Sequence, residues 1–520
     1  MRRLLVLPLL LAALAVPSIG ASQSAPQGPA SDDGPDPSGL TDALRADGDT
    51  AARAPDLRSD AEILRATREA IVEILDDPDL PEAFWGLFVQ DARTGRVLVS
   101  RNARKNFVPA STLKLFTSAT ALDALGPDFR YSTRLYFFGD EGSDGVLRGD
   151  LVIRGAGDPT FGSDLSRVDP LETWAEALAE AGVRRVEGRI IGDDGRGEDE
   201  PYPEGWDVSH IATESYAPAS GGLPWADNLV NVKLAGTSNG SQATVTVDPP
   251  GFGTITSDVV SGRSGLSIRR ALGTDEIELE GGVSTRYRGT VRLPVANPTL
   301  YAAAALADRL REAGIVVQAQ TFDADDLDRP VDYGAAEPLQ VAVSPTLDRI
   351  VERVLQESDN LYAEQLLRTV SPDGSIDGGV RRVLAFADEA GADTDGLNIV
   401  DGSGLSRKNL VTPMAMAAVL QRMRTHPASG DFLRALPTGG TPGSTLRSRL
   451  RGVPVRAKTG SLLAVRCLAG YVEGPRGEPL VFVILANHYT TNGGRIGQAA
   501  DRIVRALHEG ERLPITERDD

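Results

Sequence analysis

The 520-residue sequence predicts an α/β (α+β) protein whose main domain is an antiparallel sheet flanked by helices, with β-rich domains inserted between its two halves. Three observations support this fold class. The chain is too long for one ordinary domain. Helical apolar spacing and strand signals occur together near both ends of the ordered part. Between them, about 200 residues carry short β-like runs separated by Gly- and Asp-rich turns, enough for one or two domains.

Composition limits the kinds of partner that the chain can bind. Its hydrophobic content of 41% is sufficient for packed cores, and its formal charge of −19 argues against nucleic acid and anionic membrane surfaces. The single cysteine, Cys467, excludes an intramolecular disulfide. Because the neighbours of Cys467 are apolar, we expect a buried structural thiol rather than a nucleophile.

The first 60 residues predict an export signal followed by a linker. Residues 1–21 combine Arg2 and Arg3 with an apolar stretch and small residues at its end, the pattern of a signal peptide. We therefore expect an exported protein of the periplasm or cell envelope with no stable membrane span after cleavage; an uncleaved N-terminal anchor is the alternative. Residues 22–60 are rich in Ser, Pro, Gly, Asp and Ala, which predicts a disordered linker.

The first half of the main domain is expected over residues 61–132. It opens with a helix whose apolar face repeats at helical spacing, at Ile63, Leu64, Ile71, Ile74 and Leu75. Residues 85–100 then predict a hairpin around a Gly-containing turn. Pro109 suits a helix start, and the small or apolar residues that follow predict a helix from residue 110 to 125.

The inserted β-rich part is expected over residues 133–333. Strand-like runs lie at 133–138, 150–153, 189–192, 230–234 and 243–247, and helices are predicted at 171–181 and 298–313. Residues 236–240 fit the G-x-S-x-G pattern of a serine nucleophile, which requires a strand-to-helix turn. Strand-like sequence follows them here, so the Asn-Gly pair favours a hairpin tip instead.

The second half of the main domain is expected over residues 334–515. An apolar helical stripe runs from 347 to 355, and helical texture continues to about residue 423. Three antiparallel strands are predicted at 453–459, 466–472 and 480–486, followed by an amphipathic helix around 499–507 that packs on the domain.

Ser111 and Lys114 are three residues apart at the start of the predicted 110–125 helix, so they share one helix face. A serine hydroxyl is a weak nucleophile until a base takes its proton, and a desolvated lysine with a lowered pKa can do so. The chain has five lysines beside 49 arginines, and only Lys114 has a serine three residues before it. Since arginine cannot accept a proton, a lysine in this arginine-rich chain is a candidate for a catalytic role.

Two further motifs are uninformative when each is taken alone. Ser358-Asp359-Asn360 falls between two predicted helices, where such residues usually serve as caps. Lys458-Thr459-Gly460 falls at the end of a predicted strand, where a glycine allows close approach of a ligand or another backbone. Together, in this order and context, S-x-x-K, S-x-N and K-T-G are the motif set of penicillin-binding proteins and class A β-lactamases.

With this set the chain resembles the D-alanyl-D-alanine carboxypeptidase/endopeptidase family, the low-molecular-mass class C penicillin-binding proteins. Residues 155–160, 401–407 and 468–471 add to the resemblance, as does the long insertion between Ser111 and Ser358; it covers roughly residues 60–510. The resemblance implies a β-lactamase/transpeptidase-like catalytic domain split over residues 61–132 and 334–515. It also implies a site that residues 402–406 help to shape.

The resemblance also implies a role for each motif residue. Ser111 is the acylated nucleophile and Lys114 its proton acceptor, while Ser358 and Asn360 complete the proton relay and hold the substrate amide. Lys458 and Thr459 meet the terminal carboxylate of the substrate, for which a cation and a hydroxyl are suited. Gly460 is expected to leave room for substrate, and the main-chain N–H groups of Ser111 and Ser461 to form the oxyanion hole. No metal or cofactor is implied.

The implied function is that of a serine DD-peptidase on peptidoglycan stem peptides. The expected activity is D-Ala-D-Ala carboxypeptidase, with endopeptidase cleavage of cross-links at the same site and covalent inhibition by β-lactam antibiotics. A serine β-lactamase is one alternative, although the position of its deacylating glutamate holds Thr394. A non-catalytic peptidoglycan-binding protein is the other, although no motif residue is missing. Nothing in the sequence indicates the oligomeric state.

Overall fold

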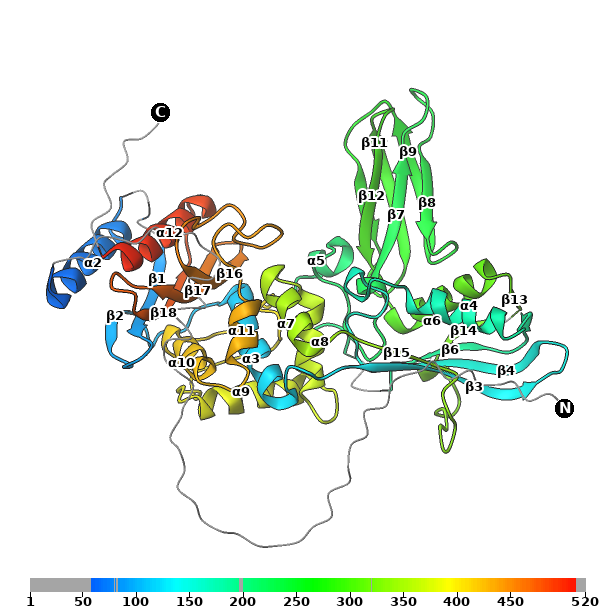
Figure 1. Cartoon of the computed structure of the whole chain (residues 1–520). Coiled ribbons are helices and arrows are strands. Elements are labelled where there is room, and N and C mark those ends of the chain that lie inside the picture. The colour runs from blue at the N-terminus through cyan, green and yellow to red at the C-terminus, as the bar shows by residue number, and fades with distance from the viewer. Residues whose placement is uncertain (1–57, 79, 81–82, 196–199, 319, 511–520) are drawn as a thin grey trace, which may run out of the picture.

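The computed structural model describes residues 58–78, 80, 83–195, 200–318 and 320–510 (Figure 1). The predicted signal peptide lies wholly outside these residues, and so does the predicted linker except for its last three residues. Ser59 there caps the first described helix, α2 (Asp60–Leu75), by accepting a hydrogen bond from the Glu62 amide. Within the described ranges, no helix combines the length and the apolar content that a bilayer crossing needs.

The two ends of the described chain build one antiparallel sheet, as the sequence predicts. Its strand order is β16-β17-β18-β1-β2, so the N-terminal hairpin joins the three C-terminal strands where β1 pairs with β18. The bounds are β1 (Phe84–Asp91), β2 (Val97–Arg101), β16 (Val455–Leu462), β17 (Val465–Glu473) and β18 (Pro479–Asn487). Helices α2 and α12 (Gly493–Glu509) pack on one face, and their apolar residues share a core with the strands.

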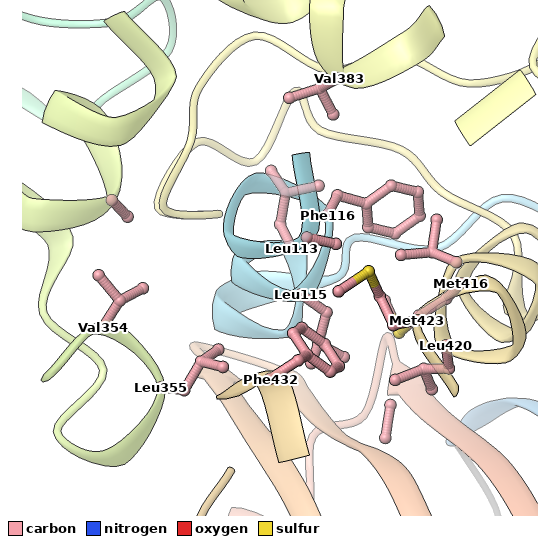
Figure 2. Close-up of a cluster of buried hydrophobic side chains, with 14 of the residues drawn as sticks. Leu113, Leu115, Phe116, Val354, Leu355, Val383, Met416, Leu420, Met423 and Phe432 are labelled. Atoms are coloured by element: carbon pink, nitrogen blue, oxygen red, sulfur yellow. The ribbon is translucent and has the colours of Figure 1, made fainter. Parts of the chain in front are cut away.

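The other face of the sheet carries a group of helices around α3 (Lys114–Leu125). Figure 2 shows Leu113, Leu115 and Phe116 surrounded by apolar side chains from these neighbouring helices. The neighbours are α7 (Leu347–Gln356), α8 (Asn360–Thr369), α9 (Ile376–Glu389), α10 (Pro413–Arg424) and α11 (Ser429–Ala435). Because neighbouring helices enclose α3, the packing around its buried side chains holds them in place.

The predicted α-helix from residue 110 is wrong in its first turn. Residues Ala110–Leu113 form a 3₁₀ turn, η1, and the α-helix begins only at Lys114. Ala110, the first residue of this turn, has a φ of +47°, a left-handed conformation through which an α-helix does not continue. Ser111 therefore lies on the 3₁₀ turn and Lys114 opens the α-helix that follows it.

The insertion contains two units. The first is a mixed sheet that lies beside the helices around α3 (Figure 1). Its seven strands are β3 (Ser132–Glu141), β4 (Val146–Arg154), β5 (Arg185–Val186), β6 (Ile190–Asp193), β13 (Val316–Val317), β14 (Thr321–Asp323) and β15 (Gln340–Val343). Helices α4 (Pro170–Glu180) and α6 (Pro298–Glu312) share an apolar core with it. Because β15 pairs with β3, this sheet extends beyond residue 333, where the sequence places the boundary.

A second unit of the insertion consists of two three-stranded sheets that project away from the rest (Figure 1). Their strands are β7 (Leu229–Ala235), β8 (Thr244–Asp248) and β12 (Arg288–Pro294) in one sheet, and β9 (Thr254–Ser261), β10 (Ser267–Arg270) and β11 (Glu276–Val283) in the other. Strands β7 and β8 pair antiparallel, so residues 236–240 are the predicted hairpin connection and not a nucleophile turn. Short helices complete the insertion at η2 (Asp164–Ser166), α5 (Val208–Thr213), η3 (Ala226–Asn228) and η4 (Ala324–Asp326).

Candidate active site

A buried amide side chain helps to hold the segment that leads to Ser111. The side chain of Asn487, at the end of β18, accepts a hydrogen bond from the Val108 amide at 2.8 Å and donates one to the Val108 carbonyl at 3.1 Å. Asn487 is 1% exposed, so both hydrogen bonds are shielded from water. The central sheet thereby fixes the backbone three residues before Ser111.

The amine of Lys114 makes three hydrogen bonds, each to an oxygen atom of the protein. Its Nζ is 3.1 Å from Ser111 Oγ, 2.6 Å from Asn360 Oδ1 and 2.7 Å from the Ser403 carbonyl oxygen. The side chain is fully buried, and burial lowers the pKa of Lys114 to about 8. The sequence prediction of a desolvated lysine beside the serine is therefore matched by the geometry.

The geometry around Lys114 fixes the direction of its lone pair once the amine is neutral. A neutral amine has two N–H donors and one lone pair, and two of its three neighbours here are carbonyl oxygens that can only accept. Both N–H groups are therefore directed at Asn360 and Ser403. The lone pair is left facing the Ser111 hydroxyl, which is the arrangement that proton abstraction requires.

The turn at residues 358–360 links the two predicted lysines. Ser358 has a φ of +67°, and Asp359 caps α8 by accepting a hydrogen bond from the Tyr362 amide at 3.2 Å. Asn360 accepts from Lys114 and donates through Nδ2 to the Tyr216 carbonyl at 2.7 Å. Since Tyr216 belongs to the insertion, the insertion fixes which end of this amide faces the lysine.

Lys458 approaches the same turn from the edge strand β16. Its Nζ donates to Ser358 Oγ at 2.9 Å and to the Thr459 carbonyl at 2.9 Å. Burial lowers the pKa of Lys458 well below its usual value, and the positive charge of Lys114 lowers it further. The predicted residues Ser111, Lys114, Ser358, Asn360 and Lys458 are thus brought together, with the turn between the two amines.

Gly460 is required by packing, which is the close approach of another backbone that the sequence allowed; its role in leaving room for substrate stays a prediction. A Cβ at this position would lie 2.7 Å from the Pro109 carbonyl oxygen and 3.1 Å from the Thr112 amide nitrogen. The missing side chain lets β16 lie directly against η1, the turn that carries Ser111. The strand also continues to Leu462, so residues 458–460 lie within the strand and not at its predicted end.

Comparisons with known proteins identify the family. The model of the D-Ala-D-Ala carboxypeptidase 3 (S13) family matches residues 67–507. The chain belongs to this family. It is 31% identical over 474 residues to a D-alanyl-D-alanine carboxypeptidase of Actinomadura sp. (strain R39), covering 87% of this chain and 86% of the relative. The expected membership and the class of the enzyme, a serine-type D-Ala-D-Ala carboxypeptidase, are confirmed.

The DacB protein of Haemophilus influenzae is similar to this chain in both sequence and structure. A D-alanyl-D-alanine carboxypeptidase, DacB, is 26% identical over 427 residues, covering 78% of this chain and 86% of the relative. The crystal structure of penicillin-binding protein 4 matches with a TM-score of 0.72 at 23% identity, over 84% of this chain and 99% of that one. At this identity the structural match supports the fold, which agrees with the predicted transpeptidase-like class.

Two buried carboxylates of this S13 peptidase were missed by sequence reasoning. Glu364 on α8 accepts hydrogen bonds from the Gly402 and Ser403 amides at 2.9 and 2.8 Å. Asp401 accepts from the Gly404 amide at 2.8 Å and the Ser406 amide at 2.7 Å. One sequence signal was available, because Glu364 follows the motif residue Asn360 by one helical turn and so shares its helix face.

Cys467 of the S13 peptidase is a buried structural thiol, as predicted. It lies on β17 at 4% exposure, and its Sγ is 3.7 Å from the Val108 carbonyl oxygen. Burial raises the pKa of Cys467 to about 12, so the reactive thiolate is suppressed at neutral pH. The thiol packs beneath the segment that leads to Ser111 and has no nucleophilic part in the site.

Proposed function

We propose that Ser111 is the nucleophile and Lys114 its base in a serine DD-peptidase that acts on peptidoglycan stem peptides. The observation that carries this proposal is the environment of the Lys114 amine. Two carbonyl acceptors occupy its N–H donors, and the remaining neighbour, at 3.1 Å, is the Ser111 hydroxyl. Burial, which lowers the pKa of Lys114 to about 8, makes the neutral amine accessible near neutral pH.

In the proposed acylation, Lys114 takes the proton of Ser111 while Ser111 Oγ bonds to the carbonyl carbon of the penultimate D-Ala. The main-chain N–H groups of Ser111 and Ser461 stabilise the developing oxyanion. The amide C–N bond then breaks, and the proton that Lys114 took passes to the leaving amine through the Ser358 hydroxyl, which Lys458 contacts at 2.9 Å. Water cleaves the ester, releases the shortened peptide and returns the proton to Ser111.

The carboxylate end of the substrate is assigned to Lys458 and Thr459. Burial and the charge of Lys114 lower the pKa of Lys458, so the protonated form of this amine is poorly stabilised in the free protein. A bound carboxylate supplies the missing opposite charge, so substrate binding and protonation of Lys458 reinforce each other. A peptide that ends in an amide lacks this charge and should bind more weakly.

The remaining parts of the function are inferred from relatives and from the N-terminal sequence. Penicillin-binding protein 4 of Haemophilus influenzae is known in complex with a β-lactam, which supports acylation of Ser111 by this class of antibiotic. Endopeptidase cleavage of cross-links would use the same nucleophile with a larger leaving group. The signal-like residues 1–21 and a peptidoglycan substrate both favour export to the periplasm or cell envelope.

The test is labelling with a fluorescent penicillin. Wild type should retain one covalent label, and Ser111→Ala, which removes only the hydroxyl, should retain none. Equal labelling of the two proteins would refute the assignment of Ser111. Rapid turnover of nitrocefin without retained label would instead indicate a β-lactamase. Incubation with cross-linked and uncross-linked muropeptides, followed by mass analysis of the products, separates endopeptidase from carboxypeptidase activity.

A further inference from the structure

Two consecutive peptide groups behind the active site are oriented by buried carboxylates. The peptide between Gly402 and Ser403 donates its N–H to Glu364 Oε1 at 2.8 Å and accepts at its carbonyl from Thr117 Oγ1 at 2.7 Å. The next peptide donates the Gly404 N–H to Asp401 Oδ1 at 2.8 Å and presents the Ser403 carbonyl to Lys114. In a trans peptide the N–H and C=O point in opposite directions. Each carboxylate therefore turns one carbonyl toward α3.

Both carboxylate oxygens of Glu364 accept hydrogen bonds from backbone amides. Oε2 accepts from the Gly402 amide at 2.9 Å while Oε1 accepts from the Ser403 amide, and the side chain is 1% exposed. A carboxylate is the side-chain group that can accept at both positions, because an amide of the same shape would place an N–H against one donor. The position thus selects a carboxylate for its geometry as well as its charge.

The charges around Lys114 come from four groups on the elements packed against it. Glu364 on α8, Asp401 before the Ser403 carbonyl, and Asp359 at the start of α8 are acidic and favour the ammonium. Lys458 on β16 is the basic group and opposes it. Burial lowers the pKa of Lys114, and the three carboxylates partly reverse this effect, with Glu364 the strongest of them. The pKa of Glu364 is itself raised to about 7 by burial and by Asp401.

We propose that Glu364 is a positioning residue for Lys114. It holds the Gly402 and Ser403 amides, and so anchors the loop from which the Ser403 carbonyl reaches the amine, and its negative charge opposes the loss of the proton from that amine. The inference rests on the proposed function of Lys114 as the base. Glu364 touches neither Ser111 nor the reacting bond, so it acts only through the backbone and through charge. A purely structural residue would lower the rate equally at every pH, whereas this role predicts a change in the pH profile.

The experiment measures the rate of acylation by fluorescent penicillin across the neutral and alkaline pH range. Acylation rises with pH as Lys114 becomes neutral, because only the neutral amine accepts the Ser111 proton. Glu364→Gln removes a negative charge that stabilises the ammonium. Its loss favours the neutral amine, so the rising limb should move to lower pH by about one unit. Glu364→Asp keeps the charge but shortens the reach.

Glu364→Asp should therefore keep the midpoint of the limb near its wild-type value and lower the maximum rate by roughly ten- to a hundredfold, because the carbonyl at Lys114 is misplaced. The matched control is Asp275→Asn, which neutralises a half-buried carboxylate in the projecting β unit. Asp275 accepts from the Ala296 amide at 2.8 Å, and burial raises its pKa as it does for Glu364. The control should leave both midpoint and maximum unchanged.

Two outcomes would overturn the inference while leaving the proposed function intact. One is a wild-type midpoint in Glu364→Gln, with or without a uniform loss of rate. The other is a wild-type maximum in Glu364→Asp. Thermal unfolding of each variant shows whether it is folded, and if Glu364→Gln does not fold, the maximum rate of Glu364→Asp decides. Labelling of Ser111→Ala, by contrast, would refute the proposed function itself.

Discussion

The contact between β16 and η1 makes Gly460→Ala the most informative substitution outside the reacting groups. The added Cβ would lie 2.7 Å from the Pro109 carbonyl oxygen, about 0.7 Å closer than the 3.4 Å at which ordinary contact begins. It would also meet the Thr112 amide nitrogen and the Cys467 Cβ at 3.1 Å. None of these atoms is the free end of a flexible side chain, so the strand and the 3₁₀ turn must separate.

This separation has an energetic and a kinetic consequence. Overpacking of this kind costs about 1–3 kcal/mol, and the loss of glycine entropy in the unfolded chain offsets about 0.4–1 kcal/mol of it. A net loss of about 1–2 kcal/mol of unfolding free energy is therefore expected. Because the proposed oxyanion hole takes one N–H from Ser461 on the strand and one from Ser111 on the turn, the separation should weaken it and slow acylation by about a hundredfold.

Urea unfolding and the rate of penicillin labelling measure the two effects of Gly460→Ala separately. The matched control is Gly497→Ala in α12, where an added Cβ meets nothing within 4 Å. That control should be acylated like wild type and should be more stable by up to about 1 kcal/mol, because glycine is unfavourable within a helix. Wild-type acylation and stability in Gly460→Ala would refute the reasoning about this contact.

Three further predictions concern the surroundings of the site. Asn487→Ala leaves the buried amide and carbonyl of Val108 without their partner, so urea unfolding should show a loss of about 2–4 kcal/mol; a loss below 1 kcal/mol would contradict this. Between a folded pKa of about 8 and the usual 10.5 for Lys114, the unfolded chain holds a proton that the folded chain does not. Wild-type stability should therefore rise over this interval by up to about 3 kcal/mol relative to Lys114→Met, and equal pH slopes would count against it. Iodoacetamide should leave folded Cys467 unmodified, and rapid alkylation before unfolding would contradict its burial.

Much of the catalytic half of this fold could be predicted from the sequence because its elements follow simple periodicities. The stripe at residues 347–355 became α7, and the apolar runs near the C-terminus became three antiparallel strands. The three motifs also meet where the family resemblance requires. These predictions succeed because helix faces and buried strands carry their pattern within a few residues of one another.

The predictions that failed depend on contacts between distant segments. The left-handed Ala110 and the 3₁₀ turn after it cannot be inferred from local propensity, since alanine favours a continuous helix. The packing role of Gly460 requires knowing that η1 lies against β16. Glu364 was missed because its partners are backbone amides, which every sequence position possesses and no motif marks. Asp401 lies within the 401–407 motif, but its hydrogen bonds, including the one from Trp206 in the insertion, depend on the fold.

Helix α8 has a consequence for how this enzyme can change over evolution or by design. Its first residue, Asn360, contacts Lys114, while further along Gln365 donates to the Gly221 carbonyl at 2.7 Å and Arg368 donates to Ser220 Oγ at 3.1 Å. Both partners belong to the insertion. The projecting sheets can be lengthened, trimmed or replaced at their tips. The loop at residues 220–221, which bonds to α8, cannot be changed in this way. A minimal enzyme made by excising the whole insertion would lose one wall of its own reaction centre.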